Sequence, residues 1–162
     1  MLAIIILLGC RNTPLQTLEP IPVPTPQWTE LCGQRGSEDL DALVQKVAGE
    51  TGMSPALLSA VVTHESTCNP KALGSSGEIG LTQIHPKVWS ETLVKEGFIR
   101  QSQDLWDPET NLRCAAFILQ GHLQRTNGNI WKTLRKYNGS GPMARAYADT
   151  VTPIYDHLSK EY

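Results

Sequence analysis

Apolar residues recur at intervals of three and four in the part of the chain that follows residue 36. The first stretch with this spacing holds Leu40, Val44 and Val47, and it begins directly after Ser37, a residue type that commonly caps the first turn of a helix. Acidic residues follow the serine in the expected first turn, and the helix dipole favours negative charge at this N-terminal end. The spacing therefore predicts a helix that begins near Ser37 and ends at Gly52.

A second helix is predicted after Ser54-Pro55, because serine can cap the helix and proline loses no hydrogen bond at the first helical position. One face of this helix carries three apolar residues, Leu58, Val61 and Val62. Glu65 follows them at helical spacing and falls on the same face. Asn69-Pro70 is expected to stop the helix, since the residue before a proline avoids helical geometry.

The segment KALGSSGEIGLTQIHP, residues 71–86, is rich in glycine and serine and predicts an irregular loop or a small hairpin. Beyond it the same helical spacing returns. It predicts a short helix from Pro86 to Trp89, a longer one from Asp107-Pro108 to Asn127, one from Trp131 to Asn138, and a last one from about Pro142 past Val151 that Pro153 interrupts. No sustained strand alternation and no internal repeat is present in the sequence, so the domain is predicted to be mainly α, with six or so helices.

The N-terminus has a continuous apolar run and no helical spacing of apolar and polar residues. Leu2 to Leu8 form an apolar run that is too short to cross a bilayer but has the length of a signal-peptide core. The run ends in Leu7-Leu8-Gly9-Cys10, which resembles a bacterial lipobox, and in that interpretation Cys10 receives a lipid and becomes the first residue of the mature protein. The alternatives are an uncleaved apolar tail and a misassigned start codon.

Prolines recur through residues 11–36 and favour an extended polyproline II conformation without a core. We therefore divide the chain into a signal and lipobox segment (1–10), a Pro-rich tether (11–36) and a folded domain (37–162). A tether between a lipid anchor and a domain lets the domain reach away from a membrane.

Composition narrows the classes of function. The chain has 162 residues, of which 40% are hydrophobic and 19% charged, which suits one folded domain with some additional length. The formal net charge is only −2, so the sequence lacks the positive charge of a nucleic-acid-binding domain and no nucleic-acid partner is expected.

Four cysteines are present, and in an exported protein they can form disulfides. If Cys10 carries a lipid, three remain. Cys68 and Cys114 both fall in predicted helices of the domain, so we expect this pair to form the disulfide and Cys32, near the domain edge, to remain single. Buried free thiols are the alternative.

Glu65 lies in the segment HESTC and has three interpretations. The first is a solvated glutamate at the edge of an apolar stripe. The second is a zinc site, because HESTC differs from HExxH only in that Cys68 replaces the second histidine, but no third ligand stands out. The third is a general acid in a partly apolar cleft, where burial raises the pKa of a carboxyl so that it can donate a proton to a glycosidic oxygen.

Several short motifs favour the third interpretation. Glu65-Ser66 is followed by Asn69-Pro70, by Gly80-Leu81-Thr82-Gln83 after the glycine-rich loop, by a helix start at Asp107-Pro108-Glu109 with Asn111, and by Tyr137-Asn138. In order and spacing these motifs resemble those of the soluble lytic transglycosylases, lysozyme-like enzymes that cleave bacterial peptidoglycan. The resemblance covers roughly residues 38–155 and implies a mainly α, goose-type or SLT-type lysozyme fold with the glycine-rich loop or a small hairpin at the active-site cleft.

The resemblance also implies roles. Glu65 would protonate the oxygen between N-acetylmuramic acid and N-acetylglucosamine, and would then accept the proton of the muramoyl 6-hydroxyl as a 1,6-anhydro ring closes. Tyr137 would orient Glu65 by hydrogen bonding. The remaining residues expected to bind substrate are Ser66, Gln83, Asn138 and Tyr147. No metal and no cofactor is implied, and either tyrosine can instead be a core residue with a satisfied hydroxyl.

Two departures from the family pattern concern the sugar subsites. Thr82 stands where the family usually has methionine, and Gly74 stands where serine is common. A third open point is Glu78, whose place in the loop is compatible with a solvated side chain or with the second carboxylate of a hydrolase.

Two alternatives to the transglycosylase therefore remain: a hydrolytic muramidase on the same fold, and a non-catalytic protein that binds peptidoglycan. Either would act in the bacterial cell envelope. With Arg11 after Cys10, an outer-membrane lipoprotein that faces the periplasm is expected. The resemblance also suggests phage lysis or entry, secretion or conjugation machinery as possible partners.

Overall fold

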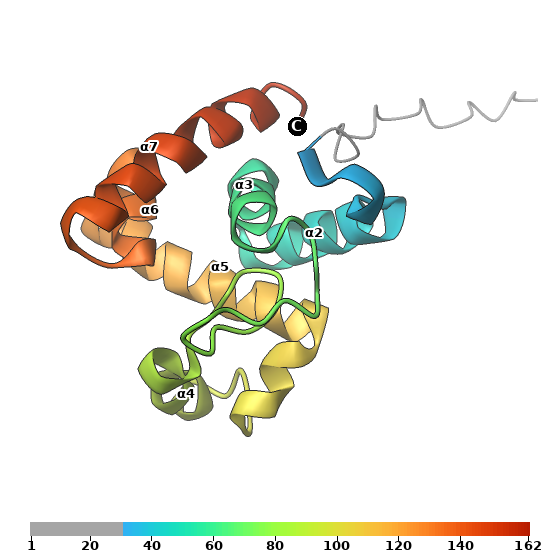
Figure 1. The fold of residues 1–162 in the computed structure, drawn as a ribbon, viewed down its shortest axis with the longest axis vertical. Helices are drawn as coiled ribbons and strands as arrows, with labels where there is room; N and C mark the ends of the chain where they lie inside the picture. Colours follow the sequence, from blue (N-terminus) through green and yellow to red (C-terminus); the bar gives the residue numbers. More distant parts are fainter. Residues whose placement is uncertain (1–30) are drawn as a thin grey trace, which may run out of the picture.

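The computed structural model describes residues 31–162, and Figure 1 shows how their helices are arranged. A short 3-10 helix (Gly33–Arg35) leads into α2 (Glu38–Thr51), α3 (Pro55–Ser66), α4 (Pro86–Lys95), a second 3-10 helix η2 (Ser102–Trp106), α5 (Pro108–Arg125), α6 (Ile130–Asn138) and α7 (Gly141–Leu158). The prediction of a mainly α domain is confirmed. The candidate lipid site at Cys10 and most of the predicted Pro-rich tether lie outside the described residues.

The helix starts follow the capping residues. Ser37 Oγ accepts a hydrogen bond from Leu40 N at 3.1 Å, and Ser54 Oγ accepts one from Leu57 N at 3.4 Å, so both predicted N-caps are confirmed. At the other end of α2, Gly52 adopts the left-handed conformation (φ +68°) that ends many helices. None of the helices between residues 31 and 162 is long and apolar enough to cross a membrane.

The last helix is longer than the sequence predicts. Pro153 lies inside α7, which continues to Leu158, so the expected interruption at this proline is wrong. A proline inside a helix removes one backbone hydrogen bond. Packing outweighs that loss, because Val151 before the proline and Leu158 after it are both buried against the rest of the domain.

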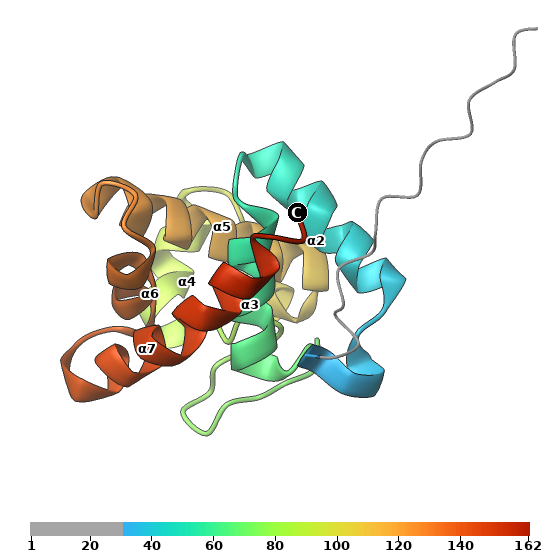
Figure 2. The ribbon, with the colours of Figure 1, turned by 90° about the horizontal axis from the view of Figure 1, so that it is seen from above.

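Helix α3 occupies the middle of the larger part of the domain, where it packs against α2, α5 and α7. Figures 1 and 2 show α7 crossing over α3, while α4 and η2 form a smaller lobe on the opposite side of α5. All side chains from position 56 to position 63 are buried, so α3 has no solvent-facing side until its last turn.

Tyr162, after the last helix, forms hydrogen bonds with side chains of α2 and α3. The hydroxyl of Tyr162 donates to Asp41 Oδ1 at 2.9 Å and lies 2.9 Å from Ser59 Oγ. Gln45 donates to the other oxygen of Asp41 at 2.7 Å. This partly buried network ties α2 and α3 to the residues that follow α7.

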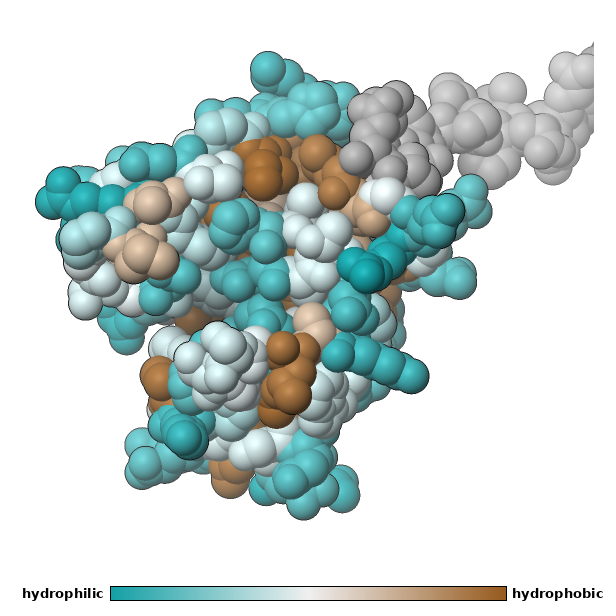
Figure 3. All heavy atoms as spheres, in the orientation of Figure 1, coloured by the Kyte–Doolittle hydropathy of each residue, from teal (hydrophilic) through white to brown (hydrophobic). Residues whose placement is uncertain are grey.

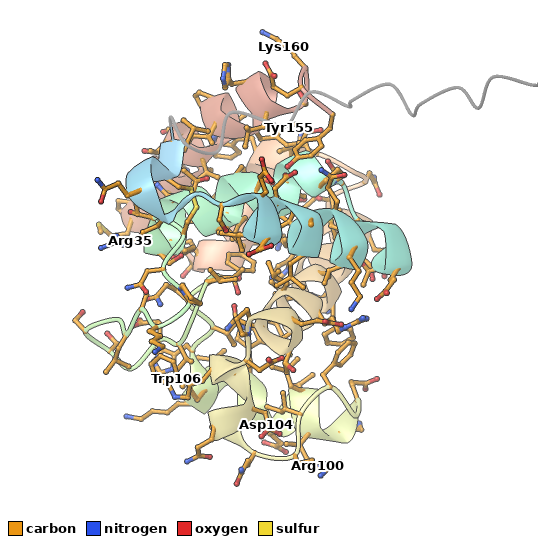
Figure 4. The ribbon with its side chains drawn as sticks, turned by 90° about the vertical axis from the view of Figure 1, so that its right-hand side faces the viewer. Arg35, Arg100, Asp104, Trp106, Tyr155 and Lys160 are labelled. Carbon is orange, nitrogen blue, oxygen red and sulfur yellow. A yellow bond between two sulfur atoms is a disulfide. The ribbon has the colours of Figure 1, made fainter. Side chains whose placement is uncertain are left out.

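In the smaller lobe, a carboxylate fixes the turn before η2. Asp104 Oδ2 accepts hydrogen bonds from the backbone amides of Arg100 (2.7 Å) and Gln101 (3.3 Å), and these bonds lower the pKa of the Asp104 carboxyl. Figure 4 shows Arg100 and Asp104 at the end of this lobe, far from Tyr155 and Lys160 on the larger part. These hydrogen bonds fix the turn from within the smaller lobe itself.

The disulfide joins Cys32 to Cys68, with their Cα atoms 5.6 Å apart, and Cys114 is a buried free thiol. The predicted Cys68–Cys114 pair is therefore wrong. The prediction placed Cys68 on a helix, but α3 ends at Ser66, and Cys68 lies in a left-handed turn (φ +61°). That turn directs its sulfur toward the segment before α2, where Cys32 is buried in the core.

The disulfide should contribute substantially to stability, because it closes a long loop of the unfolded chain. For a separation of 36 residues, replacing both Cys32 and Cys68 by serine should lower the free energy of unfolding by about 3 to 4 kcal/mol. Denaturant unfolding of a purified protein that includes Cys32 measures this loss. Cys114→Ala should keep the disulfide and lose the same increment only when a reductant is added; a variant with Cys114→Ala that is insensitive to reductant would contradict the pairing.

Candidate functional site

Glu65 lies on the last turn of α3, where the helix leaves the core, and its side chain is partly buried. It opens into a cleft of about 370 Å³ between the larger part of the domain and the smaller lobe. The cleft is lined by Glu65, Glu78, Gln83, Ile84, His85, Val88, Trp89, Ile118, His122, Lys136, Tyr137, Asn138 and Gly139. Since α3 is enclosed up to this turn, the carboxyl of Glu65 is held in apolar surroundings at the wall of an open space.

These surroundings change the acidity of Glu65. The pKa of its carboxyl is raised from 4.5 to about 7: burial is the largest cause, the Tyr147 hydroxyl acts in the opposite direction, and the negative charge of Glu78 adds to the rise. A large fraction of the Glu65 side chains is therefore protonated at neutral pH. A solvated glutamate would be almost fully ionised there, so the first interpretation of this residue does not fit the structure.

The rings of His64 and Tyr147 lie close to Glu65. The ring of His64 meets that of Tyr147 edge-on, with their centroids 5.0 Å apart. The Tyr147 hydroxyl has no hydrogen-bond partner of normal geometry within residues 31–162, and it influences the Glu65 carboxyl by its proximity. Burial and the charge of Glu65 raise the pKa of Tyr147 well above its usual value, so the hydroxyl stays protonated and can donate. His64 thus has a packing role beside the site and does not lie among the residues that line the cleft.

Tyr137 also lines the cleft, but its hydroxyl donates to the carbonyl oxygen of Thr82 at 2.9 Å. The predicted partner was Glu65, so the structure gives Tyr137 a different contact. Burial, together with the charge of Glu65, raises the pKa of Tyr137 well above its usual value. Tyr137 connects α6 to the glycine-rich loop, and it is Tyr147 whose hydroxyl faces Glu65.

The glycine-rich loop, predicted as an irregular loop or a small hairpin, forms two isolated antiparallel bridges, from Ile79 to Leu73 and to Ile84, and residues 73–84 are called the hairpin below. Asn111 of α5 connects this hairpin to η2 through its side-chain amide. Its amide donates to Ile79 O (2.9 Å) and Leu105 O (3.0 Å), and its oxygen accepts from Thr82 N (3.0 Å) and Thr82 Oγ1 (2.6 Å). The hydroxyl that Thr82 carries in place of the family's methionine therefore faces the core and not the cleft.

Gln83 and Asn138, two predicted substrate-binding residues, both line the cleft. The side-chain nitrogen of Gln83 donates to Ala72 O (3.2 Å) and Gly80 O (2.9 Å), which fixes the amide in one orientation. Ser66 differs, because it is buried and its hydroxyl donates to Val62 O at 3.1 Å within α3. A contact between Ser66 and substrate stays a prediction.

The zinc interpretation loses its second ligand. Cys68 is part of the disulfide, so its sulfur is not available as a thiolate, and the helix on which an HExxH motif depends has already ended at Ser66.

Sequence reasoning missed the opposite wall of the cleft. Trp89 of α4 meets the ring of His122 of α5 at a centroid distance of 6.2 Å, and Lys136 lies nearby on α6. Burial, then the charges of Arg125 and Lys136, lower the pKa of His122, so its ring is neutral at neutral pH. Only the tryptophan, a large flat side chain near a loop, carried a signal that could have suggested a sugar contact.

Exposed apolar side chains are scattered over the domain. Figure 3 shows separate apolar patches within a mostly polar surface. Among the most exposed large apolar residues are Leu73 in the loop, Val88 on α4 and Met143 on α7. Val88 is also a lining residue, so it gives the cleft an apolar edge that suits the carbon face of a sugar ring.

A comparison with known protein families shows to which family this domain belongs. The model of the transglycosylase SLT domain matches residues 42–153, which include Glu65, the hairpin, Asn111 and both tyrosines. The chain belongs to the transglycosylase SLT domain family. The match covers most of the residues described here and begins inside α2.

Solved structures agree with this SLT domain in fold. The lytic transglycosylase Slt from Pseudomonas aeruginosa, solved as an inactive variant with a glutamate replaced by glutamine, superposes with a TM-score of 0.65 at 22% sequence identity. A 70-kDa soluble lytic transglycosylase in complex with bulgecin A gives 0.67 at 20% identity. Each match covers 74% of this chain and 24% of the other, so the chain spans about a quarter of the length of these proteins.

The raised pKa of Glu65 should make stability depend on pH in a defined direction. From pH 4.5 to about 7, the folded SLT domain keeps a proton on Glu65 that the unfolded chain has released, so stability falls as pH rises through this window. Glu65→Gln has no proton to lose. Its stability relative to wild type should therefore increase by about 3 kcal/mol between about pH 4 and about pH 8.

Denaturant unfolding of both proteins at the two pH values measures this difference. Glu91→Gln, on the exposed side of α4, is the matched control and should change stability equally at both pH values. A difference between wild type and Glu65→Gln that is constant with pH would show that the carboxyl of Glu65 titrates normally.

Proposed function

We propose that this SLT domain is a peptidoglycan lytic transglycosylase that cleaves the β-1,4 bond between N-acetylmuramic acid and N-acetylglucosamine without water. The observation that carries the proposal is a single glutamate, Glu65, whose pKa is raised to about 7 at the wall of an open cleft. Family membership supports it, and so does a structural neighbour that is inactive with a glutamate replaced by glutamine.

In the first step the protonated carboxyl of Glu65 donates its proton to the glycosidic oxygen. The bond from C1 of the muramoyl sugar to this oxygen breaks, and its electron pair leaves with the oxygen, so positive charge develops on the sugar ring. The Glu65 carboxylate that remains is the base of the second step.

In the second step the 6-hydroxyl of the same sugar attacks C1, and its proton passes to Glu65. A 1,6-anhydro ring forms and the enzyme returns to its starting protonation state. A pKa near neutrality suits one carboxyl that must both donate and accept a proton in each cycle.

The acid role predicts a direction for the pH profile. The rate constant kcat/KM should fall as pH rises through about 7, because the fraction of protonated Glu65 falls there. Glu65→Gln should reduce the release of muropeptides from purified sacculi by about 1000-fold while its circular dichroism spectrum stays that of wild type.

Mass spectrometry of the released fragments separates the candidate functions. Anhydro-muropeptides are expected from wild type, and the control Glu91→Gln should give the same products at the same rate. Products with only reducing ends would replace the proposal with a hydrolytic muramidase. If wild type and Glu65→Gln both sediment with sacculi and neither cuts them, the domain is a binding module.

For the N-terminal segment we propose a lipid anchor at Cys10 and a location in the bacterial envelope, facing the periplasm at the outer membrane. The support is the sequence Leu7-Leu8-Gly9-Cys10 before a proline-rich stretch. Membrane affinity grows with each buried methylene group, so an acylated Cys10 would hold the chain on a bilayer.

This location has a direct test in cells fed with an alkyne-tagged fatty acid. Wild type should incorporate the label and sediment with membranes, and Cys10→Ser should do neither. Cys114→Ala, which removes a buried thiol, should be labelled like wild type. Unlabelled wild-type protein in the soluble fraction would contradict the anchor.

A further inference from the structure

The hairpin brings a second carboxylate to the cleft. Glu78 is partly buried and lines the same space as Glu65. Its negative charge contributes to the raised pKa of Glu65, which means that the two carboxyl groups interact across this space. No ion pair found between residues 31 and 162 neutralises Glu78.

The turn at the tip of the hairpin holds this carboxylate in place. Gly74 N donates to Glu78 O at 2.8 Å and Gly77 N donates to Gly74 O at 3.0 Å, which closes the turn. The backbone amide of Ser76 donates to Glu78 Oε2 at 3.1 Å. The side chain is therefore folded back over the turn and does not extend freely into solvent.

Gly74 supplies the space that the carboxylate occupies. A Cβ atom at this position would lie 2.2 Å from Glu78 Oε2 and 2.7 Å from Gln83 Oε1, which is closer than atoms can approach. The φ of Gly74 is not in the left-handed region, so the backbone conformation does not require glycine here. A side chain at position 74 would therefore displace the ends of two polar side chains of the cleft.

We propose that Glu78 is a second functional carboxylate of the cleft, which stabilises the positive charge that develops on the sugar ring as the glycosidic bond breaks. The inference rests on the proposed function. Glu65 protonates the leaving oxygen and the electron pair of the broken bond leaves with that oxygen. Glu78 forms no bond; its fixed negative charge lowers the energy of the cationic sugar until the 6-hydroxyl attacks C1. Glu65 then receives the hydroxyl proton.

The first test is Glu78→Gln, which keeps the size of the side chain and removes its charge. The expected result is a loss of about 10- to 100-fold in kcat for sacculus digestion, with KM within about threefold of wild type. The falling limb of the pH profile should also move to lower pH, because Glu65 loses a neighbouring negative charge. Glu91→Gln should change neither quantity.

The second test uses Gly74 to displace the carboxylate without changing its charge. Gly74→Ala should lower kcat in the same direction, because the added Cβ pushes Glu78 off its position. In a cycle with Glu78→Ala the two changes should be partly non-additive, since the alanine at position 74 then has only the Gln83 side chain left to displace. A purely structural effect on the turn would instead be additive.

The outcomes separate this inference from the function on which it rests. A wild-type protein that does not cut sacculi would overturn both. If wild type cuts, Glu65→Gln does not, and Glu78→Gln keeps the wild-type rate and pH profile, only the role of Glu78 is wrong. If wild type releases reducing ends that disappear in Glu78→Gln, the carboxylate activates water, and the charge-stabilising role is replaced by a hydrolytic one.

Discussion

The site depends on the enclosure of α3. From position 56 to position 63 this helix has no side in contact with solvent, so its course is set by the core and not by the cleft. Glu65 comes two residues after this enclosed stretch and therefore reaches the cleft wall while its side chain is still partly buried. Burial is accordingly the largest cause of its raised pKa. The acidity of the residue follows from where a buried helix ends.

A second constraint places the other wall relative to the first. Asn111 lies on α5, which packs against α3, and three of its four hydrogen bonds hold the hairpin that carries Glu78 and Gln83, while the fourth goes to Leu105 O in η2. The approach is so close that a Cβ on Gly80 would lie 2.5 Å from the Asn111 side chain. Tyr137 adds a bond from α6 to the same hairpin through Thr82 O. Both sides of the cleft thus contact α5, which keeps the distance between Glu65 and the hairpin fixed.

Local chemistry made much of this predictable. Capping serines gave the starts of α2 and α3, and the motif order gave Glu65, Gln83 and Tyr137 as neighbours in space. What failed depends on tertiary contacts that spacing does not carry. The end of α3 two residues before Cys68 decides the disulfide, and burial on both sides of Pro153 decides that α7 continues.

Glu78 shows the same limit from the functional side. Its spacing is compatible with a solvated loop residue and with a cleft residue, and only the folded structure, which lines the cleft with Glu78 and holds its carboxylate over Gly74, distinguishes the two. The carboxyl of Glu65, kept partly buried near the Glu78 carboxylate, works against stability at neutral pH, because its charged form is poorly solvated. The fold has stabilising features outside the cleft, such as the Cys32–Cys68 disulfide just after α3 and the hydrogen bonds of the Tyr162 hydroxyl to Asp41 of α2 and Ser59 of α3. These restraints act on α2 and on α3, the helix that carries Glu65, so they stabilise the fold and also fix the position of the acid.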